Sequence, residues 1–204
     1  MKYNPDLHHR RSIRLRDHDY ANAGAYFVTV CCQNRECLFG EIINGKMILN
    51  EYGEIAHNEL AKTPEMRTNV ELCEFVVMPN HIHAIVRITE KTEGAFNTPL
   101  WSLQSPSNTV GAIIRGYKSA VSKQIREYGR GVLNTPSNNT HTPNNTAHTP
   151  QISIWQRNYW EHIIRNGTEY EEIANYIKNN PILWAKDCFN VGEGKHTSGI
   201  FSQI

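Results

Sequence analysis

The stretch FVVMPNHIHAIVRI, residues 75–88, constrains the fold more than any other segment of this chain. It contains two apolar runs, on either side of Pro79-Asn80, rich in the β-branched residues typical of strands. The connection is too short for a crossover between parallel strands, which takes about a dozen residues or more, so the strands must be antiparallel neighbours. The second strand begins with His81 and His83, which leave the same face of the strand about 7 Å apart.

Other segments carry the same strand signature. The run GAYFVTVCC, residues 24–32, is dense in β-branched and aromatic residues and is predicted to form a central strand. A fourth strand is expected within residues 152–165. Residues 37–50 place Asn44-Gly45 between two apolar runs, which is a strong hairpin signal, so a separate ribbon is expected beside the main sheet.

Two helices are predicted between these strands. Asn50 has the side chain of an N-cap, and the helix that follows it is expected to stop at Pro64. The segment 109–129 repeats apolar residues at helical spacing, with its basic residues largely on the other side. The apolar positions of this second helix are Val110, Ile113, Ile114, Tyr117, Val121, Ile125 and Tyr128.

A third helix is predicted near the C-terminal end of the chain. Thr168 and Glu171 have the T-x-x-E spacing of a capping box that opens the helix, and Pro181 closes it. The resulting order is strand, helix, strand, strand, helix, strand, with the ribbon inserted and the third helix appended. This order predicts an α+β fold, a ferredoxin-like split β-α-β sandwich with an antiparallel sheet.

The length of 204 residues predicts a single domain over residues 1–204. Residues 134–150 are an imperfect repeat of Asn, Thr, Pro and His with almost no apolar residue, so we expect a disordered insertion in a surface loop. The five cysteines contain no C-x-x-C pair, and neither a disulfide framework nor a cysteine zinc site is predicted. Without an apolar segment for secretion or bilayer insertion, we expect a soluble cytoplasmic protein that makes no membrane contact.

The net charge is only +1, but the basic residues are unevenly placed. They crowd residues 2–16 and the segment 115–130, and both clusters are of a kind that binds phosphate groups. Charge runs like these are also typical of solvated arms and helix faces, so that alternative stays open.

Two residue pairs are candidates for a functional site. His81 and His83 are placed to share one metal ion, although a solvent-facing alternation on a half-buried strand also explains an isolated H-x-H. Tyr176 and Asn180 are four residues apart on the third helix, so a phenol and an amide oxygen leave the same face. The alternative is that Tyr176 packs against the sheet while Asn180 caps the helix before Pro181.

Together these motifs resemble the HUH endonucleases, in which a histidine-hydrophobe-histidine strand holds a divalent metal and a tyrosine on a neighbouring helix cuts single-stranded DNA. The segments VVMPNHIHAIV, WQRNYWEHIIRN and YIKNNP look more closely like the REP-associated tyrosine transposases, as does the opening RRSIRLRDHDYANAGAYFVTVCCQNRECLFG. The resemblance covers nearly the whole chain outside residues 134–150.

The resemblance implies that His81 and His83 are metal ligands, Asn180 is a third ligand and Tyr176 is the nucleophile. It implies a metal-dependent endonuclease and strand transferase that forms a 5′-phosphotyrosine at hairpin-associated sites in single-stranded DNA. Two imidazoles and an amide oxygen suit Mg²⁺ or Mn²⁺. The protein is expected to be a monomer or a homodimer, with cleavage in cis or in trans undecided. The residues expected to contact DNA are Arg10, Arg11, Arg14, Arg115, Lys118, Lys123 and Arg157.

Other functions fit the same motifs. A replication initiator or relaxase of the same superfamily would share the site, and a noncatalytic nucleic-acid-binding module would share the sheet. Trp155, Tyr159 and Trp160 are candidates for stacking on bases or for packing in the core. Tyr159 and Tyr170 are the rival nucleophiles.

Overall fold

A four-stranded antiparallel sheet forms the centre of the computed structural model, which describes residues 22–90, 109–133 and 153–190. Its strands lie in the order β4-β5-β1-β6, and each neighbouring pair is antiparallel. All strands predicted for the main sheet are confirmed, the fourth at the end of its expected segment. They are β1 (Gly24–Cys31), β4 (Val70–Val77), β5 (His81–Ile88) and β6 (Trp160–Ile164).

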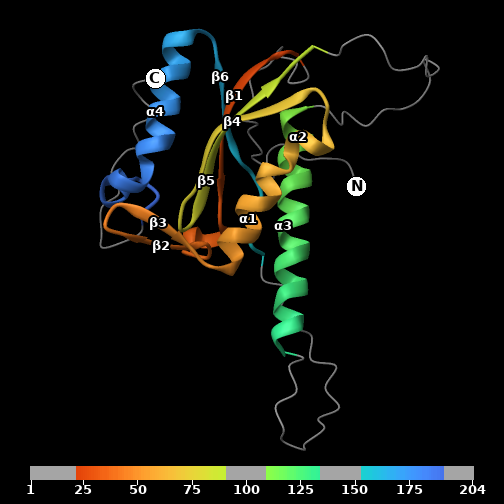
Figure 1. Cartoon of the computed structure of the whole chain (residues 1–204), viewed down its shortest axis with the longest axis vertical. Helices are drawn as coiled ribbons and strands as arrows, with labels where there is room; N and C mark the ends of the chain where they lie inside the picture. The colour runs from red at the N-terminus through yellow and green to blue at the C-terminus, as the bar shows by residue number, and fades with distance from the viewer. Residues whose placement is uncertain (1–21, 91–108, 134–152, 191–204) are drawn as a thin grey trace, which may run out of the picture.

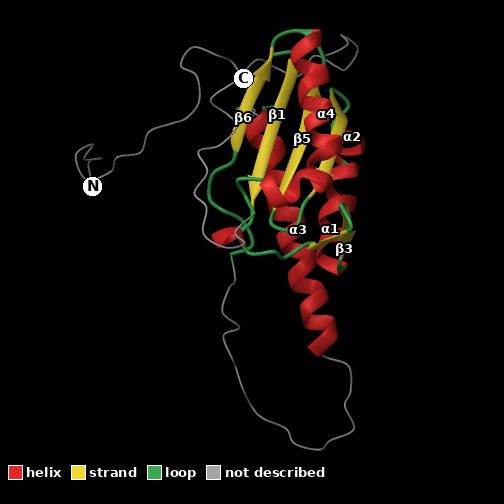
Figure 2. Ribbon diagram, turned by 90° about the vertical axis from the view of Figure 1, so that its left-hand side faces the viewer, coloured by secondary structure: helices red, strands yellow, loops and turns green. Residues whose placement is uncertain are grey.

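Helices cover both faces of this sheet (Figure 1). The helix α1 (Glu51–Ala61) connects β1 to β4, and α3 (Val110–Leu133) connects β5 to β6. Both lie on one face, whereas α4 (Gly167–Leu183) covers the other, as Figure 2 shows from a second direction. The predicted ferredoxin-like α+β fold with an appended C-terminal helix is therefore confirmed.

The alternation of side chains along β5 separates two apolar clusters. Ile82, Ala84 and Val86 belong to the larger cluster, under α1 and α3, while Ile85 belongs to the smaller cluster with residues of α4. Because successive side chains of a strand point to opposite faces, His81 and His83 lie on the same side as Ile85. The histidines therefore start the face that α4 covers.

The predicted ribbon is confirmed as β2 (Gly40–Ile43) paired with β3 (Lys46–Leu49). Asn44 has φ 51° and Gly45 has φ 73°, the two positive angles that a type I′ turn requires. The tip of the ribbon lies against the end of α4, because a Cβ on Gly45 would meet the Ile182 side chain at 3.6 Å.

The first helix begins where the sequence predicts but ends differently. The Asn50 side chain accepts a hydrogen bond from the Gly53 amide, which confirms the N-cap. The expectation that Pro64 stops this helix is wrong, because the helix ends at Ala61 and Pro64 lies inside a second short helix, α2 (Thr63–Met66). Proline fits there because the first amides of a helix have no carbonyl partner in the helix.

The predicted start of α4 is also wrong. Its N-cap is Asn166, whose side chain accepts from the Glu169 amide at 2.9 Å, and not Thr168. The Glu169 carboxylate reaches back to the Arg165 amide at 2.6 Å, so the reciprocal bond of the capping box goes to the residue before the N-cap. Pro181 does not close α4 but lies within it, because its φ suits a helix and only one amide donor is lost near the end.

The apolar face predicted for α3 is confirmed. Six of its seven predicted positions are buried, and only Tyr128 is exposed, at 40%. Tyr117 closes the contact with α1 by donating a hydrogen bond to the Ala56 carbonyl. Among the described residues, no helix has both the length and the apolar character that crossing a membrane requires.

Candidate metal centre and nucleophile

The histidine pair, His81 and His83, lies on β5 beneath α4. Both side chains are fully buried, and their Nε2 atoms are 3.0 Å apart. The rings of Phe27 and Phe189 pack beside them, with centroids 5.2 Å from His83 and 4.5 Å from His81 respectively. Two imidazole nitrogens thus converge at one point inside the protein.

Asn80 fixes the orientation of His81. Its Nδ2 donates to the carbonyls of Arg35 and Phe189, at 3.1 and 2.7 Å, which determines which end of the amide is oxygen. Its Oδ1 lies 2.9 Å from His81 Nδ1 and can only accept, so His81 carries its proton on Nδ1. The Nε2 lone pair of His81 is then available to a metal ion.

Thr29 contacts the corresponding nitrogen of His83. The two residues are cross-strand partners on β1 and β5, and Thr29 Oγ1 lies 2.8 Å from His83 Nδ1. A hydroxyl that accepts from Nδ1 leaves the Nε2 lone pair for a metal, as hydrogen-bond partners of metal-bound histidines commonly do. Thr29 was not among the predicted site residues, although its place opposite His83 follows once the strand register is known.

The helix α4 brings Tyr176 and Asn180 to the histidine pair. The Tyr176 hydroxyl lies 3.3 Å from His83 Nε2. Asn180 is 1% exposed, and its Oδ1 is buried without a hydrogen-bond partner in the described part of the chain. An orphaned buried amide oxygen is costly unless a cation or a water satisfies it.

Tyr170 points elsewhere on the same helix. Its hydroxyl donates to the Glu74 carboxylate on β4 at 2.7 Å. Two residues six positions apart lie about 240° apart around a helix, so Tyr170 and Tyr176 cannot both face the histidine pair. The structure places Tyr176 there.

Asp187 joins this cluster, and nothing in the sequence analysis pointed to it. Its Oδ2 accepts from Asn180 Nδ2 at 3.0 Å and lies 4.0 Å from His81 Nε2. The Phe189 amide holds the other oxygen at 2.7 Å. Ligand atoms of His81, His83 and Asp187 all lie within 4.8 Å of one another. Asp187 follows the 3₁₀ turn η2 (Trp184–Lys186), and no regular spacing links it to the histidines.

Burial sets the charges in the cluster. It lowers the pKa of both histidines, to about 3 for His83, so both imidazoles are neutral and able to act as ligands. Burial also raises the pKa of Asp187. The pKa of Tyr176 is raised by burial and by the Asp187 carboxylate, which favours the neutral phenol while no cation is nearby.

These donors fit a divalent metal ion. Two imidazole nitrogens, a carboxylate oxygen and an orphaned amide oxygen form a mixed N/O set of the kind that Mn²⁺ accepts. The carboxylate is only 2% exposed, and a cation would compensate its charge.

The residues expected to contact DNA are distributed over the molecule. Arg10, Arg11 and Arg14 lie outside the described residues. Arg115 and Lys123 are exposed on α3, on the face of the sheet opposite the histidine pair. Lys118 is partly buried, and its ammonium donates to the carbonyls of Gln156 and Asn158 at 2.9 Å each. Arg157 is exposed between these two residues.

Of the aromatic residues expected to stack on bases or to pack, Trp155 belongs to the core. It is 6% exposed, and its ring packs against Phe39 and Tyr117. Tyr159 and Trp160 are half-buried and line a cavity beside the histidine pair.

Comparison with known proteins gives three informative similarities, while no family model matches the chain. An uncharacterized protein of Haemophilus influenzae is 42% identical over 192 residues, covering 91% of this chain and 96% of the relative. The Escherichia coli REP-associated tyrosine transposase is 24% identical over 169 residues, covering 82% of this chain and 73% of that protein.

A solved structure of a REP-associated tyrosine transposase bound to a REP hairpin aligns with a TM-score of 0.51 and 18% identity. The alignment covers 92% of this chain and 96% of the other. The two chains therefore share a fold, which extends over nearly all of both.

Proposed function

We propose that this chain, which is similar in sequence and fold to REP-associated tyrosine transposases, cuts and rejoins single-stranded DNA with Tyr176 as the nucleophile. One observation carries the proposal: the Tyr176 hydroxyl lies 3.3 Å from Nε2 of a buried histidine that shares a cluster with His81 and Asp187. The nucleophile and the ligands belong to one chain, so cleavage in cis is part of the proposal.

The proposed reaction exchanges one phosphodiester for another. Tyr176 Oη attacks the phosphorus, the new Oη–P bond forms, and the bond from phosphorus to O3′ breaks. The phenolic proton passes to solvent water, and the departing oxygen takes up a proton to leave a free 3′-OH. The 5′-phosphotyrosine conserves the bond energy, so a second 3′-OH can reverse the step and join a new strand.

The residues that would hold a divalent ion are His81 and His83 through Nε2, Asp187 through Oδ2 and Asn180 through Oδ1. When bound, Mg²⁺ or Mn²⁺ would act as a Lewis acid on a phosphate oxygen and favour the phenolate. The protein side chains orient the phosphate and keep Tyr176 in place. Asn80 Oδ1 holds the proton of His81 on Nδ1, and with the metal bound Thr29 Oγ1 would accept the Nδ1 proton of His83, which leaves both Nε2 atoms to the metal.

The proposed substrate is single-stranded DNA next to a hairpin. Support comes from the relative that was solved bound to a REP hairpin and shares this fold. In this chain, Arg157 lies in the loop before β6, at an edge strand of the sheet, and is exposed between Gln156 and Asn158, which line the cavity beside the histidine pair. We propose that the strand enters along this edge.

A nicking assay tests the proposal. The full-length protein is incubated with a hairpin oligonucleotide that carries single-stranded arms on both sides, with Mn²⁺ or with EDTA. We expect cleavage by the wild type and by Tyr170→Phe in Mn²⁺, and none by Tyr176→Phe or in EDTA. Undiminished cleavage by Tyr176→Phe would overturn the assignment, and DNA binding without any cleavage would favour a noncatalytic binding module.

A further inference from the structure

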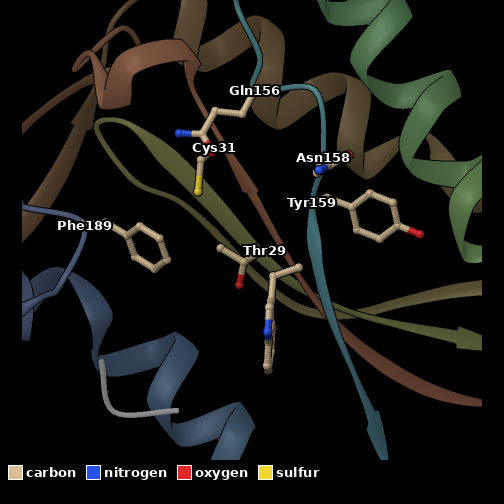
Figure 3. Close-up of a pocket in the computed structure, with 7 residues that line it drawn as sticks. Thr29, Cys31, Gln156, Asn158, Tyr159 and Phe189 are labelled. Carbon is tan, nitrogen blue, oxygen red and sulfur yellow. The ribbon is translucent and has the colours of Figure 1, made fainter. Parts of the chain in front are cut away.

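A cavity of about 270 Å³ lies beside the histidine pair, on the face of the sheet that α4 covers. Its floor comes from β1, one wall from the segment before β6, and the opposite wall from the segment after α4 (Figure 3). The lining residues are Thr29, Cys31, Gln156, Asn158, Tyr159, Trp160 and Phe189.

Two of these residues link the cavity directly to the proposed metal centre. Thr29 holds His83 through the contact of 2.8 Å between Oγ1 and Nδ1. The Phe189 ring lies 4.5 Å from the ring of His81 and 5.9 Å from the ring of His83. A group bound in the cavity would therefore be a close neighbour of the phosphate that Tyr176 attacks.

The lining defines the chemistry of the occupant. The aromatic rings of Trp160 and Phe189 help to make most of the lining apolar, whereas the Tyr159 ring points toward α3 (Figure 3). None of the described residues that line the cavity is acidic or basic. This composition disfavours a phosphate group and favours a flat, neutral, unsaturated ring. Two carboxamides, of Gln156 and Asn158, add donors and acceptors that could read the edge of such a ring.

The cavity wall is held by the backbone. Gln156 donates its amide to the Cys31 carbonyl at 3.0 Å, and Gln33 donates to the Ile154 carbonyl at 2.8 Å, which fastens this segment to the end of β1. Lys118 then binds the carbonyls of both Gln156 and Asn158. The two carboxamides therefore project from a fixed segment, and discrimination between bases requires such a fixed position.

We propose that this cavity binds one unstacked nucleobase adjacent to the scissile phosphate, and that the Gln156 carboxamide selects which base it accepts. The proposal rests on the proposed function, because it names a specificity site for the same DNA strand. Among the described residues, no partner holds the Gln156 side chain, whereas its backbone is bonded at both N and O.

Photocrosslinking tests the location of the base. The non-cleaving Tyr176→Phe protein is irradiated with a hairpin oligonucleotide whose single-stranded arms carry 5-iodouracil, and crosslinked peptides are mapped by mass spectrometry. We expect a crosslink on Trp160 or Phe189. If the protein retains the DNA but crosslinks only outside these two residues, the cavity does not hold a base.

Selection from a randomised pool tests the role of Gln156. Hairpins with randomised arms are incubated with wild type, Gln156→Ala and Gln33→Ala, and the cleaved fraction is sequenced. We expect a base preference at one position near the cut that falls about tenfold in Gln156→Ala and persists in Gln33→Ala, a glutamine outside the cavity. An unchanged preference in Gln156→Ala would overturn the inference, while absence of cleavage by the wild type would instead overturn the proposed function.

Discussion

Asn80 and Thr29 determine which ring nitrogens of the histidine pair face the proposed metal. Each one contacts Nδ1 of its histidine and leaves Nε2 directed at the other histidine and at Tyr176. Asn80 also ties the site to the segment that carries Asp187, because it donates to the Phe189 carbonyl. The site therefore depends on residues that would not themselves touch a metal.

Removing the Thr29 hydroxyl should weaken metal binding without abolishing the fold. We expect Thr29→Val to lower Mn²⁺ affinity by about 10- to 100-fold, the usual effect of losing a hydrogen-bond partner of a ligand histidine, and Thr29→Ser to remain close to wild type. Isothermal titration calorimetry with Mn²⁺ measures both variants. Equal affinities in Thr29→Val and Thr29→Ser would show that the hydroxyl does not orient His83.

Asp187 should matter for the metal and not for the metal-free fold. Asp187→Asn keeps the shape but removes a buried charge, so we expect the Tm without metal to stay the same or rise. The increase in Tm on adding Mn²⁺ should shrink strongly, because binding to the native state alone causes it. Differential scanning calorimetry with and without Mn²⁺ measures both effects.

The ligand variants have an expected order in the same assay. His81→Ala and His83→Ala should abolish the Mn²⁺ effect, whereas Asn180→Ala should reduce it least, because water can replace an amide oxygen. A full Mn²⁺ effect in Asp187→Asn would remove Asp187 from the ligand set.

Much of this cluster was predictable from local spacing, and part of it was not. His81 and His83 share a face because a strand alternates, and Tyr176 and Asn180 share a face because they are one helical turn apart. Asp187 has no such regularity, since an irregular turn after α4 brings it to His81. A resemblance built on motifs likewise points to residues inside the motifs and misses a candidate ligand beyond them.

At the scale of elements, the start of α4 gives a prediction about pH. The Arg165 amide donates a hydrogen bond to the Glu169 carboxylate, and His162 Nε2 lies 2.6 Å from Glu169 Oε1. Both contacts hold the pKa of Glu169 below its usual value. A carboxylate with a lowered folded-state pKa stabilises the fold above its unfolded pKa of about 4.3 and loses that effect as the pH falls through the folded value. Glu169→Gln should therefore cost about 1 kcal/mol at pH 7 and much less at pH 3.

Glu171→Gln is the matched control, because Glu171 is exposed on the same helix and is the partner that the sequence pattern suggested. Urea unfolding at both pH values compares the free energies of unfolding. If Glu171→Gln lowers the free energy of unfolding at pH 7 more than Glu169→Gln does, α4 begins with the predicted capping box of Thr168 and Glu171.

Elements were predictable where composition or periodicity over a whole segment decides them, and less so where single contacts do. Runs of apolar, β-branched and aromatic residues identified β1, β4 and β5, and the Asn44-Gly45 turn identified the ribbon. The beginning of α4 depends on a choice between two polar side chains two residues apart, Asn166 and Thr168. Asn166 is the N-cap because Glu169, at the third helical position, donates its amide to the Asn166 side chain and also accepts a hydrogen bond from the Arg165 amide.

At the scale of the whole molecule, the proposed active centre and α3 lie on opposite faces of the sheet (Figure 1). The expectation that Arg115, Lys118, Lys123 and Arg157 contact DNA rests on their charge, because a sequence does not show which face of the sheet each side chain occupies. Lys118 supports the cavity wall through two backbone carbonyls, which leaves Arg157 as the exposed cation of that wall.

This arrangement predicts unequal effects on DNA binding. Arg157→Ala should weaken binding and reduce the slope of log K against log salt by about 1, the value for one lost phosphate contact. Lys123→Ala should change little, because Lys123 is on α3, where its side chain is 74% exposed and lies 3.9 Å from Glu127. Fluorescence anisotropy of a labelled hairpin oligonucleotide at several salt concentrations measures both slopes, and a larger effect of Lys123→Ala would place the DNA on the α3 face.

The central claim is that Tyr176 becomes covalently joined to DNA, and mass spectrometry of the trapped adduct tests it most directly. The wild-type protein is reacted in Mn²⁺ with a hairpin oligonucleotide and digested with protease and nuclease, and the modified peptide is sequenced. We predict one residual nucleotide on Tyr176, attached through its 5′-phosphate. A nucleotide on Tyr159 or Tyr170, or an adduct of undiminished yield in Tyr176→Phe, would contradict the account.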